Sequence, residues 1–205
     1  NIRAWDDLLQ TVYGLELRAD SPRGSRQYRL DDHHHRVSIY SSKTDEVRFI
    51  GWEVDSLDDL EAMKTKLADN GVKVKRGSKA EINERAVMDM IRCEDPDGFK
   101  TEIFYTGILD NTPFRPSRGM AGFNTGHMGL GHIVLHSKDK PKAMDFYEGL
   151  LGFKLSDYIH WPDADGAMAE GTFMHCNSRH HSIALMNEAF GAKGGDFNHL
   201  LFEAK

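Results

Sequence analysis

Several features that define other classes of protein are scarce in this sequence of 205 residues. Its two cysteines, Cys93 and Cys176, are too few for a disulfide framework, and both stand in strand-like contexts, which favours a reducing cytoplasm. No apolar run approaches the roughly 20 residues that a membrane helix requires. Basic residues are not in excess, because the formal net charge is −6. Neither nucleic acid nor an anionic membrane is therefore expected as a partner.

Histidine is the residue type present in unusual number, with eleven copies. The run His33–His35 follows two aspartates in a predicted turn, and we expect it to be solvated and chemically inert. Three later stretches each resemble a short strand that carries histidine among apolar residues: Gly129–Leu135, Asn177–Leu185 and Phe197–Glu203. Side by side, such strands would direct imidazoles into one cavity. We interpret this pattern as a mononuclear metal site.

The apolar spacing predicts an α+β protein built from repeated units. The spacing of Trp5, Leu8, Leu9 and Val12 is helical and ends at Gly14, and a second helix begins after Ser56 as its N-cap. A third helix is predicted from Pro141 to Leu151. Strands are predicted at Leu15–Ala19, Ser25–Leu30, Val37–Ser41, Val47–Val54, Val87–Cys93, Lys100–Tyr105 and Leu130–Leu135, with a turn at Asp95–Gly98.

Two parts of the chain repeat each other. Phe146–Leu155 mirrors Leu8–Leu17, Ser182-Ile183 matches Ser38-Ile39, and Phe202-Glu203 matches Trp52-Glu53. The sequence therefore predicts paired β-α-β-β-β modules in two domains. Residues 1–116 would form an N-terminal domain of two modules without its first strand, and residues 117–205 a C-terminal domain without its final module. A linker rich in Pro, Gly and Arg joins them, and both ends of the fold are expected to be truncated.

The two copies differ where chemistry would occur. By these pairings, His181 falls opposite Val37 and His199 falls opposite Phe49. A lone strand histidine is more often structural than a ligand, but a purely structural histidine would be expected in both copies. We therefore predict that the N-terminal domain is non-catalytic and that the C-terminal domain is catalytic.

The residue types narrow the metal without selecting it, because imidazole suits Fe(II), Mn(II), Zn(II) and Ni(II). A third protein ligand is needed. In the first copy, Glu102 stands on the closing strand, and its counterpart in the second copy would fall roughly 50 residues beyond His199. A site of two histidines and one carboxylate with open positions is typical of non-haem Fe(II) oxygen chemistry.

The three histidine motifs, with their order and intervals, resemble those of the two-domain type I extradiol ring-cleaving dioxygenases. They read Gly129-Leu130-Gly131-His132-Ile133-Val134, His175-Cys176-Asn177-Ser178-Arg179-His180-His181-Ser182 and Asn198-His199-Leu200-Leu201-Phe202-Glu203. The resemblance covers nearly the whole chain. It implies the vicinal oxygen chelate fold and Fe(II)-dependent cleavage of a catechol by O₂, with Mn(II) as a possible alternative metal. The implied substrate is a small bicyclic or biaryl aromatic diol, such as 2,3-dihydroxybiphenyl or 1,2-dihydroxynaphthalene, and the implied assembly is a homo-oligomer.

The resemblance also assigns roles at matching positions. His132 and His199 would ligate the metal, His181 would be the acid–base residue, and His180 would neighbour it on the opposite strand face. Val134 and Phe173 match positions that line the substrate pocket, and His180 would also lie at the substrate. Three further apolar residues, Trp161, Met168 and Met174, lie in or near a predicted loop that could border a large pocket, and plain core or surface packing is equally expected for each.

Two other functions remain open from the sequence. The same scaffold resembles glyoxalase-type isomerases and metal-dependent thiol transferases, which use no O₂ and lack the Asn-x-Arg-His-His motif. It also resembles metal-free proteins that sequester small molecules, in which His132 and His199 would have no purpose. Bound iron would separate the binding proteins from the enzymes, and O₂ consumption would separate the two enzyme classes.

Overall fold

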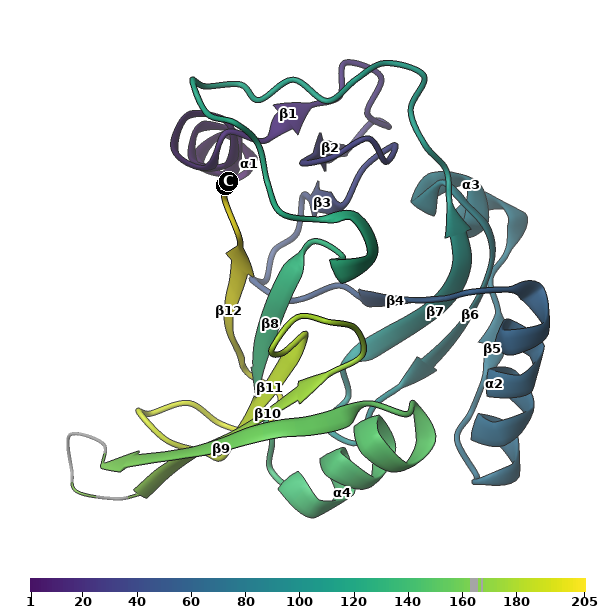
Figure 1. The fold of residues 1–205 in the computed structure, drawn as a ribbon, viewed down its shortest axis with the longest axis vertical. Coiled ribbons are helices and arrows are strands. Elements are labelled where there is room, and N and C mark those ends of the chain that lie inside the picture. The colour runs from purple at the N-terminus through teal and green to yellow at the C-terminus, as the bar shows by residue number, and fades with distance from the viewer. Residues whose placement is uncertain (163–165, 167) are drawn as a thin grey trace.

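The computed structural model describes residues 1–162, 166 and 168–205, and their strands form three sheets (Figure 1). The first sheet contains β1 (Glu16–Leu17), β2 (Ser25–Arg29) and β3 (Val37–Tyr40). The second contains β4 (Ile50–Val54), β5 (Lys75–Arg76), β6 (Val87–Glu94) and β7 (Lys100–Gly107). The third contains β8 (Gly131–His136), β9 (Lys154–Pro162), β10 (Met168–His175), β11 (Ile183–Met186) and β12 (Phe197–Phe202).

The predicted β-α-β-β-β module is confirmed in two of these sheets. The strands lie in the order β4-β7-β6-β5 in one and β8-β11-β10-β9 in the other, so the first strand of each module pairs in parallel with its last. Helix α2 (Leu57–Asp69) follows the first strand in one module and α4 (Lys140–Met144) follows it in the other, each covering one face of its sheet (Figure 1). Strand β12 then extends the third sheet by pairing with the free edge of β8.

The helical segments repeat in detail as well. Helix α1 (Ile2–Asp7) continues into a π-helical turn at Leu8–Tyr13, and α4 continues into another at Asp145–Leu150. Gly14 and Gly152 follow at matched positions with φ of 85° and 83°, a left-handed conformation that favours glycine. The sequence match between these two segments therefore reflects a shared backbone conformation.

The local predictions had different outcomes. Trp161 and Met168 lie near the adjoining ends of β9 and β10, and Met174 is fully buried in the core, a packing role that the sequence had left open. Helix α3 (Lys79–Arg85), with its Ser78–Glu81 capping box, was not predicted. The predicted N-cap of α2 is confirmed, since Ser56 accepts a hydrogen bond from the amide of Asp59. Within the described residues, no helix is both long and apolar enough to cross a membrane.

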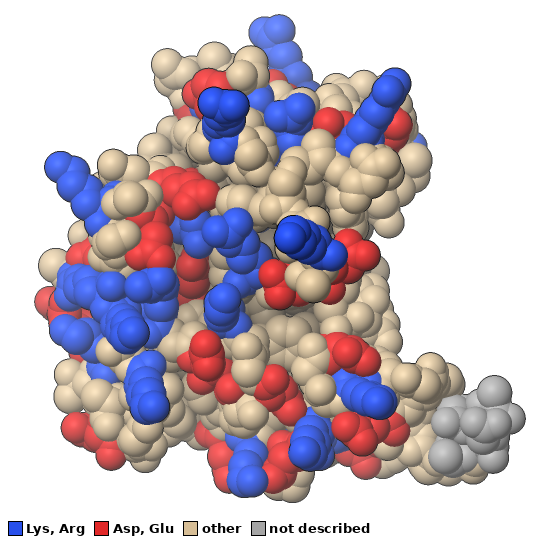
Figure 2. All heavy atoms as spheres, turned by 180° about the vertical axis from the view of Figure 1, so that it is seen from behind, with Lys and Arg blue, Asp and Glu red and all other residues tan. Residues whose placement is uncertain are grey.

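Charges of both signs lie near one another on one face of the molecule. On the face shown in Figure 2, Lys and Arg lie among Asp and Glu. Arg76 contacts both Glu61 and Asp89, and Arg92 contacts Glu81. Such pairing leaves less free positive charge for a polyanion than a cluster of unpaired basic residues would.

The run His33–His35 is half-buried, so the prediction that it is solvated was wrong. The chain segment that follows β7 covers it, because the amide of His34 donates to the carbonyl of Ile108 at 2.8 Å. The Nδ1 atoms of His34 and His35 lie 2.9 Å apart, so one ring donates a hydrogen bond to the other. The contact between His34 and Ile108 joins residues about 70 positions apart in the chain, which local sequence patterns do not reveal.

The burial of His35 predicts an acid-sensitive contribution to stability. Burial, together with the positive charge of His34, Arg18 and Arg85, lowers the pKa of His35 to about 3. The unfolded chain binds this proton near pH 6.5, so the free energy of unfolding falls by up to about 1.4 kcal/mol per pH unit as the pH drops from 6.5 towards 3. In urea denaturation, a His35→Gln variant should lose less stability between pH 7 and pH 5 than the unchanged protein. Parallel pH profiles would contradict this assignment.

The largest apolar core joins the two predicted domains. It contains Leu60, Leu67, Ile91 and Ile103 from the module of β4–β7 together with Ile133, Leu135, Phe146 and Tyr147 from the module of β8–β11. At its centre, the fully buried hydroxyl of Tyr147 donates to Asp95 Oδ2 at 2.8 Å. Asp95 Oδ1 accepts from the amides of Asp97 and Phe99 at 3.0 and 2.8 Å, which shapes the turn between β6 and β7. One carboxylate thus links that turn to the helical segment of the next module.

Removing this hydroxyl should destabilise the fold. In a Tyr147→Phe variant, Asp95 would stay buried without one of its donors, at a cost of about 1–3 kcal/mol in the free energy of unfolding. Urea denaturation at pH 7 measures the loss. The matched control is Tyr158→Phe, because Tyr158 is 44% exposed on β9 and should be nearly neutral. Equal stability of the two variants would contradict a structural role for the Tyr147–Asp95 bond.

Candidate metal centre

Strand β8 brings His132 and His199 together. It pairs antiparallel with β12, so that His132 lies opposite Leu201 and His199 lies opposite Val134, on the same face of the sheet. The two Nε2 atoms lie 3.2 Å apart. The approach of the strands depends on Gly131, where a Cβ would come within 1.7 Å of the carbonyl oxygen of Leu201. The predicted convergence of these two histidines is therefore present.

His181 adjoins this pair. Its ring centre lies 4.0 Å from that of His132, with the ring planes inclined by 37°. On the other side, Phe173 meets the His181 ring edge-on at 4.9 Å. His181 thus stands between a predicted metal ligand and a predicted substrate residue.

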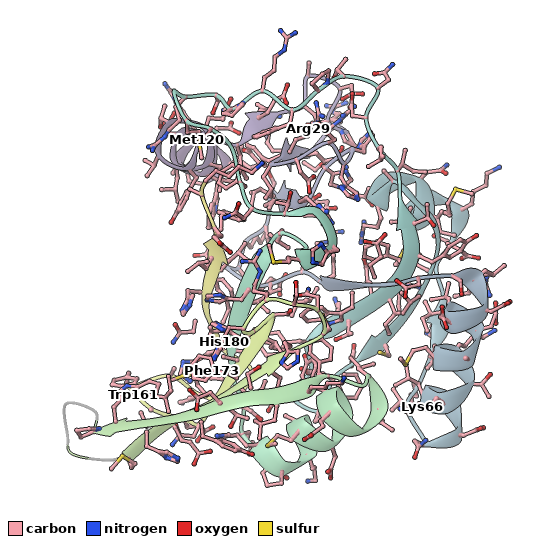
Figure 3. All side chains as sticks on the ribbon, in the orientation of Figure 1. Arg29, Lys66, Met120, Trp161, Phe173 and His180 are labelled. Carbon is pink, nitrogen blue, oxygen red and sulfur yellow. The ribbon has the colours of Figure 1, made fainter. Side chains whose placement is uncertain are left out.

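The prediction that His180 and His181 lie within a strand was wrong. Both residues lie in the loop between β10 and β11, and β11 begins only at Ile183. His180 is exposed, its Nδ1 lies 3.1 Å from Nδ1 of His181, and its ring lies 6.3 Å from Phe173 (Figure 3). His180 is therefore placed beside His181 by the loop, not on an opposite strand face.

Polar contacts that the sequence did not reveal hold this loop. The side chain of Arg179 is buried, pairs with Glu203 at the end of β12, and donates to the carbonyl of Asn124 at 2.9 Å. Asn177 accepts from the amide of Arg179 at 2.9 Å and donates to the carbonyl of Met128 at 3.2 Å. The loop that carries His181 is thereby tied to the strand that carries His199. The charge of Arg179 indicates that an acidic partner is needed, but the sequence does not show that this partner is Glu203, which lies 24 residues away.

An apolar floor lies next to the histidines on the same face of the third sheet. Val134, Ala184 and Met186 form a buried cluster, and Phe173 and Trp161 pack against it. Val134 pairs with Ala184 across β8 and β11, and Ala184 pairs with Phe173 across β11 and β10. Val134 and Phe173, both predicted at the substrate, therefore belong to one continuous surface. Figure 3 shows Phe173 near His180, with Trp161 further along the hairpin.

The surroundings favour neutral imidazoles. Burial, with the neighbouring His181, His199 and Arg179, lowers the pKa of His132 to about 4. Burial also lowers the pKa of His181 to about 4, helped by His180, His199 and Arg179. The pKa of His199 is lowered by burial alone. Neutral rings keep a lone pair, which metal ligation requires.

The donor set fits a divalent metal. Two ligand nitrogens about 2.1 Å from one ion at a right angle lie about 3.0 Å apart, close to the separation of the two Nε2 atoms. In the described part of the chain, no group of three His, Cys, Asp or Glu side chains is arranged to hold a metal. The described residues thus offer two close imidazole donors, and a metal bound between them would need further ligands.

The first copy shows what stands at the matched position. Phe49, the counterpart of His199, lies 3.7 Å from the guanidinium carbon of Arg85. The same guanidinium donates twice to the buried Glu102 on β7, at 2.9 and 3.0 Å. Phe49 and Glu102 thus converge on one cation.

The sequence and the fold are those of a known family. The model of the Glyoxalase/Bleomycin resistance protein/Dioxygenase superfamily matches residues 7–103 and 129–205, and the chain belongs to this superfamily. Its relatives include biphenyl-2,3-diol 1,2-dioxygenase of Sphingomonas paucimobilis, 39% identical over 99% of this chain and 67% of that protein. Another is 1,2-dihydroxynaphthalene dioxygenase of Pseudomonas putida, 37% identical over 98% of this chain and 66% of that protein.

A solved structure of a catechol 2,3-dioxygenase is similar throughout, with a TM-score of 0.89 and 33% identity over 98% of this chain and 70% of that one. Within the superfamily, the chain is thus one of the extradiol ring-cleaving dioxygenases. The chain spans about two thirds of the length of the curated relatives it matches.

The guanidinium of Arg85, the cation in the first copy, should stabilise the fold. In an Arg85→Met variant, Glu102 would stay buried without its partner, and the free energy of unfolding should fall by about 3 kcal/mol. Urea denaturation at pH 7 measures this loss. Adding Glu102→Gln to Arg85→Met should restore part of it, because no buried charge is then left unpaired. A double variant less stable than Arg85→Met would contradict this explanation.

Proposed function

We propose that the protein cleaves the ring of an aromatic diol with O₂, at the bond next to the two hydroxyl groups. The observation that carries this proposal is the convergence of His132 and His199, 3.2 Å apart at Nε2, with His181 and an apolar floor at their side. Membership of the extradiol dioxygenases supports it.

His132 and His199 would hold the metal through their Nε2 atoms. We assign Fe(II), although Mn(II) suits the same donors. A carboxylate at the position matched to Glu102 would complete the protein ligands. The bound ion would supply Lewis acidity towards the diol oxygens and a route for electrons to O₂, the co-substrate.

His181 would handle protons. Its neutral ring lies against His132, so a diol bound at the metal would present a hydroxyl hydrogen to a free imidazole nitrogen. His181 would take that proton and later return it to an oxygen of the opening ring. The ring of Phe173 packs against the His181 ring, and Nδ1 of His180 lies 3.1 Å from Nδ1 of His181. His180 would thereby help to orient His181 towards the substrate.

The apolar floor supports a two-ring substrate. Val134 and Phe173 would contact the ring that carries the diol, and Trp161 extends the same surface along the hairpin. Such a surface rewards a second aromatic ring through burial of apolar area. We therefore propose a bicyclic or biaryl catechol such as 2,3-dihydroxybiphenyl or 1,2-dihydroxynaphthalene. This agrees with the names of the biphenyl-diol and dihydroxynaphthalene relatives.

We further propose that residues 117–205 carry the chemistry and that residues 1–116 support it. In the first copy, Val37 and Phe49 stand where the second has His181 and His199, and Arg85 already occupies the cation position. The expected homo-oligomer and the cytoplasmic location stay predictions.

Three variants of the complete protein, loaded anaerobically with Fe(II), test the assignment. His132→Ala and His199→Ala should each lose bound iron, because each removes a ligand. His181→Ala should keep its iron, while kcat/KM for 2,3-dihydroxybiphenyl falls about 10²–10⁴-fold with the loss of proton transfer. Metal analysis and an oxygen electrode measure both quantities.

The matched control is His160→Ala, because His160 is an exposed histidine on β9. It should retain both iron and turnover. A His181→Ala variant with full turnover would refute the role of His181. An iron-loaded protein that never consumes O₂ with any diol would indicate an isomerase or thiol transferase instead.

A further inference from the structure

We propose that Asn198 and the buried His136 together position His199, by fixing which of its ring nitrogens faces the metal site. This inference rests on the proposed role of His199 as a ligand. It concerns residues to which neither the sequence motifs nor the relatives assign a role.

The first link is set by a backbone carbonyl. Nδ1 of His136 lies 2.9 Å from the carbonyl oxygen of Asn187, which can only accept a hydrogen bond. Nδ1 therefore holds a ring proton, and in an imidazole with one proton Nε2 is left as an acceptor. Because His136 is only 1% exposed, the protein fixes this tautomer instead of leaving it to solvent.

The second link fixes the amide of Asn198. The Nδ2 atom of Asn198 lies 2.9 Å from Nε2 of His136, so the amide donates there. The opposite end of the amide, Oδ1, must then face away from His136. It lies 2.7 Å from Nδ1 of His199.

The third link reaches the metal site. Since Oδ1 of Asn198 can only accept, Nδ1 of His199 must carry the ring proton. The lone pair of His199 is consequently on Nε2, the atom that lies 3.2 Å from Nε2 of His132. A metal can bind only a nitrogen with a free lone pair, so the chain of hydrogen bonds selects the ligating tautomer.

A bulge in β12 makes this arrangement possible. Phe197 pairs with Leu135 and His199 pairs with Val134, so β12 has one residue more than β8 in this interval, namely Asn198. Such an extra residue re-aims the side chains beside it. Here Asn198 turns towards His136, which stands on β8 four residues beyond His132. One strand thus supplies a ligand directly and supports the other ligand through Asn198.

The test uses the complete protein with Asn198→Ala, Asn198→Asp and Asn111→Ala. In the metal-free protein, ¹⁵N NMR should show the His199 proton on Nδ1, and Asn198→Ala should shift the population towards Nε2–H. The Fe(II) dissociation constant, from anaerobic competition with a chelator, should rise about 10–100-fold in Asn198→Ala. Asn198→Asp keeps the acceptor for His199 and should recover part of this loss. Asn111 is exposed and lies outside the site, so Asn111→Ala should match the unchanged protein in both measurements.

The outcomes separate this inference from the proposed function. A proton on Nε2 of His199 in the unchanged protein would overturn the positioning role alone. The same conclusion would follow if Asn198→Ala kept its Fe(II) affinity while His199→Ala bound Fe(II) more weakly. Unaltered affinity in His199→Ala would instead refute the metal site itself. A His136→Phe variant, which retains Asn198 but removes its anchor, should show the same tautomer shift as Asn198→Ala. Thermal unfolding of each variant establishes that the fold is kept.

Discussion

The pairing of β8 with a strand on each side is the constraint on which the site depends. Side chains alternate between the two faces of β8, so that Ile133 and Leu135 lie in the core and His132 and Val134 lie on the opposite face. Because backbone hydrogen bonds hold neighbouring strands at a nearly constant spacing, the register decides which side chains meet. A slip of one residue in β12 would send His199 to the other face, and the two imidazoles would no longer converge.

Under the proposed function, the two copies would hold different kinds of cation at matched positions. In the first, a guanidinium stacks on Phe49 and is neutralised by Glu102. In the second, neutral imidazoles stand where an ion could enter. The guanidinium of Arg85 is part of a side chain and has no open coordination position. It therefore contributes to the fold but cannot exchange ligands or bind a substrate. If the second copy is the catalytic one, as proposed, the two copies would differ in whether the positive charge belongs to the chain.

The sequence predicted the features that depend on local patterns. Apolar periodicity and the two glycine stops revealed the repeated module. The strand-like histidine motifs indicated His132, His181 and His199, and aligning the copies distinguished His181 and His199 from Val37 and Phe49. It did not predict contacts set by distant segments. The loop position of His180 and His181, the burial of His33–His35 beneath the segment after β7, and the Asn198–His136 contact all depend on tertiary pairing. A β-bulge in particular leaves no mark in residue spacing, because it exists only relative to the partner strand.

The bond between Tyr147 and Asp95 has an evolutionary consequence. It joins the module of β8–β11 to the module of β4–β7, inside a core to which both contribute. Neither half can change its contact surface without an answering change in the other. Recombination between relatives at the Pro- and Gly-rich linker would therefore give a folded protein only when both parents have matching residues in this shared core. The modular repeat in the sequence suggests that modules could be exchanged between proteins. Because the two halves pack against each other, they are instead inherited as a unit.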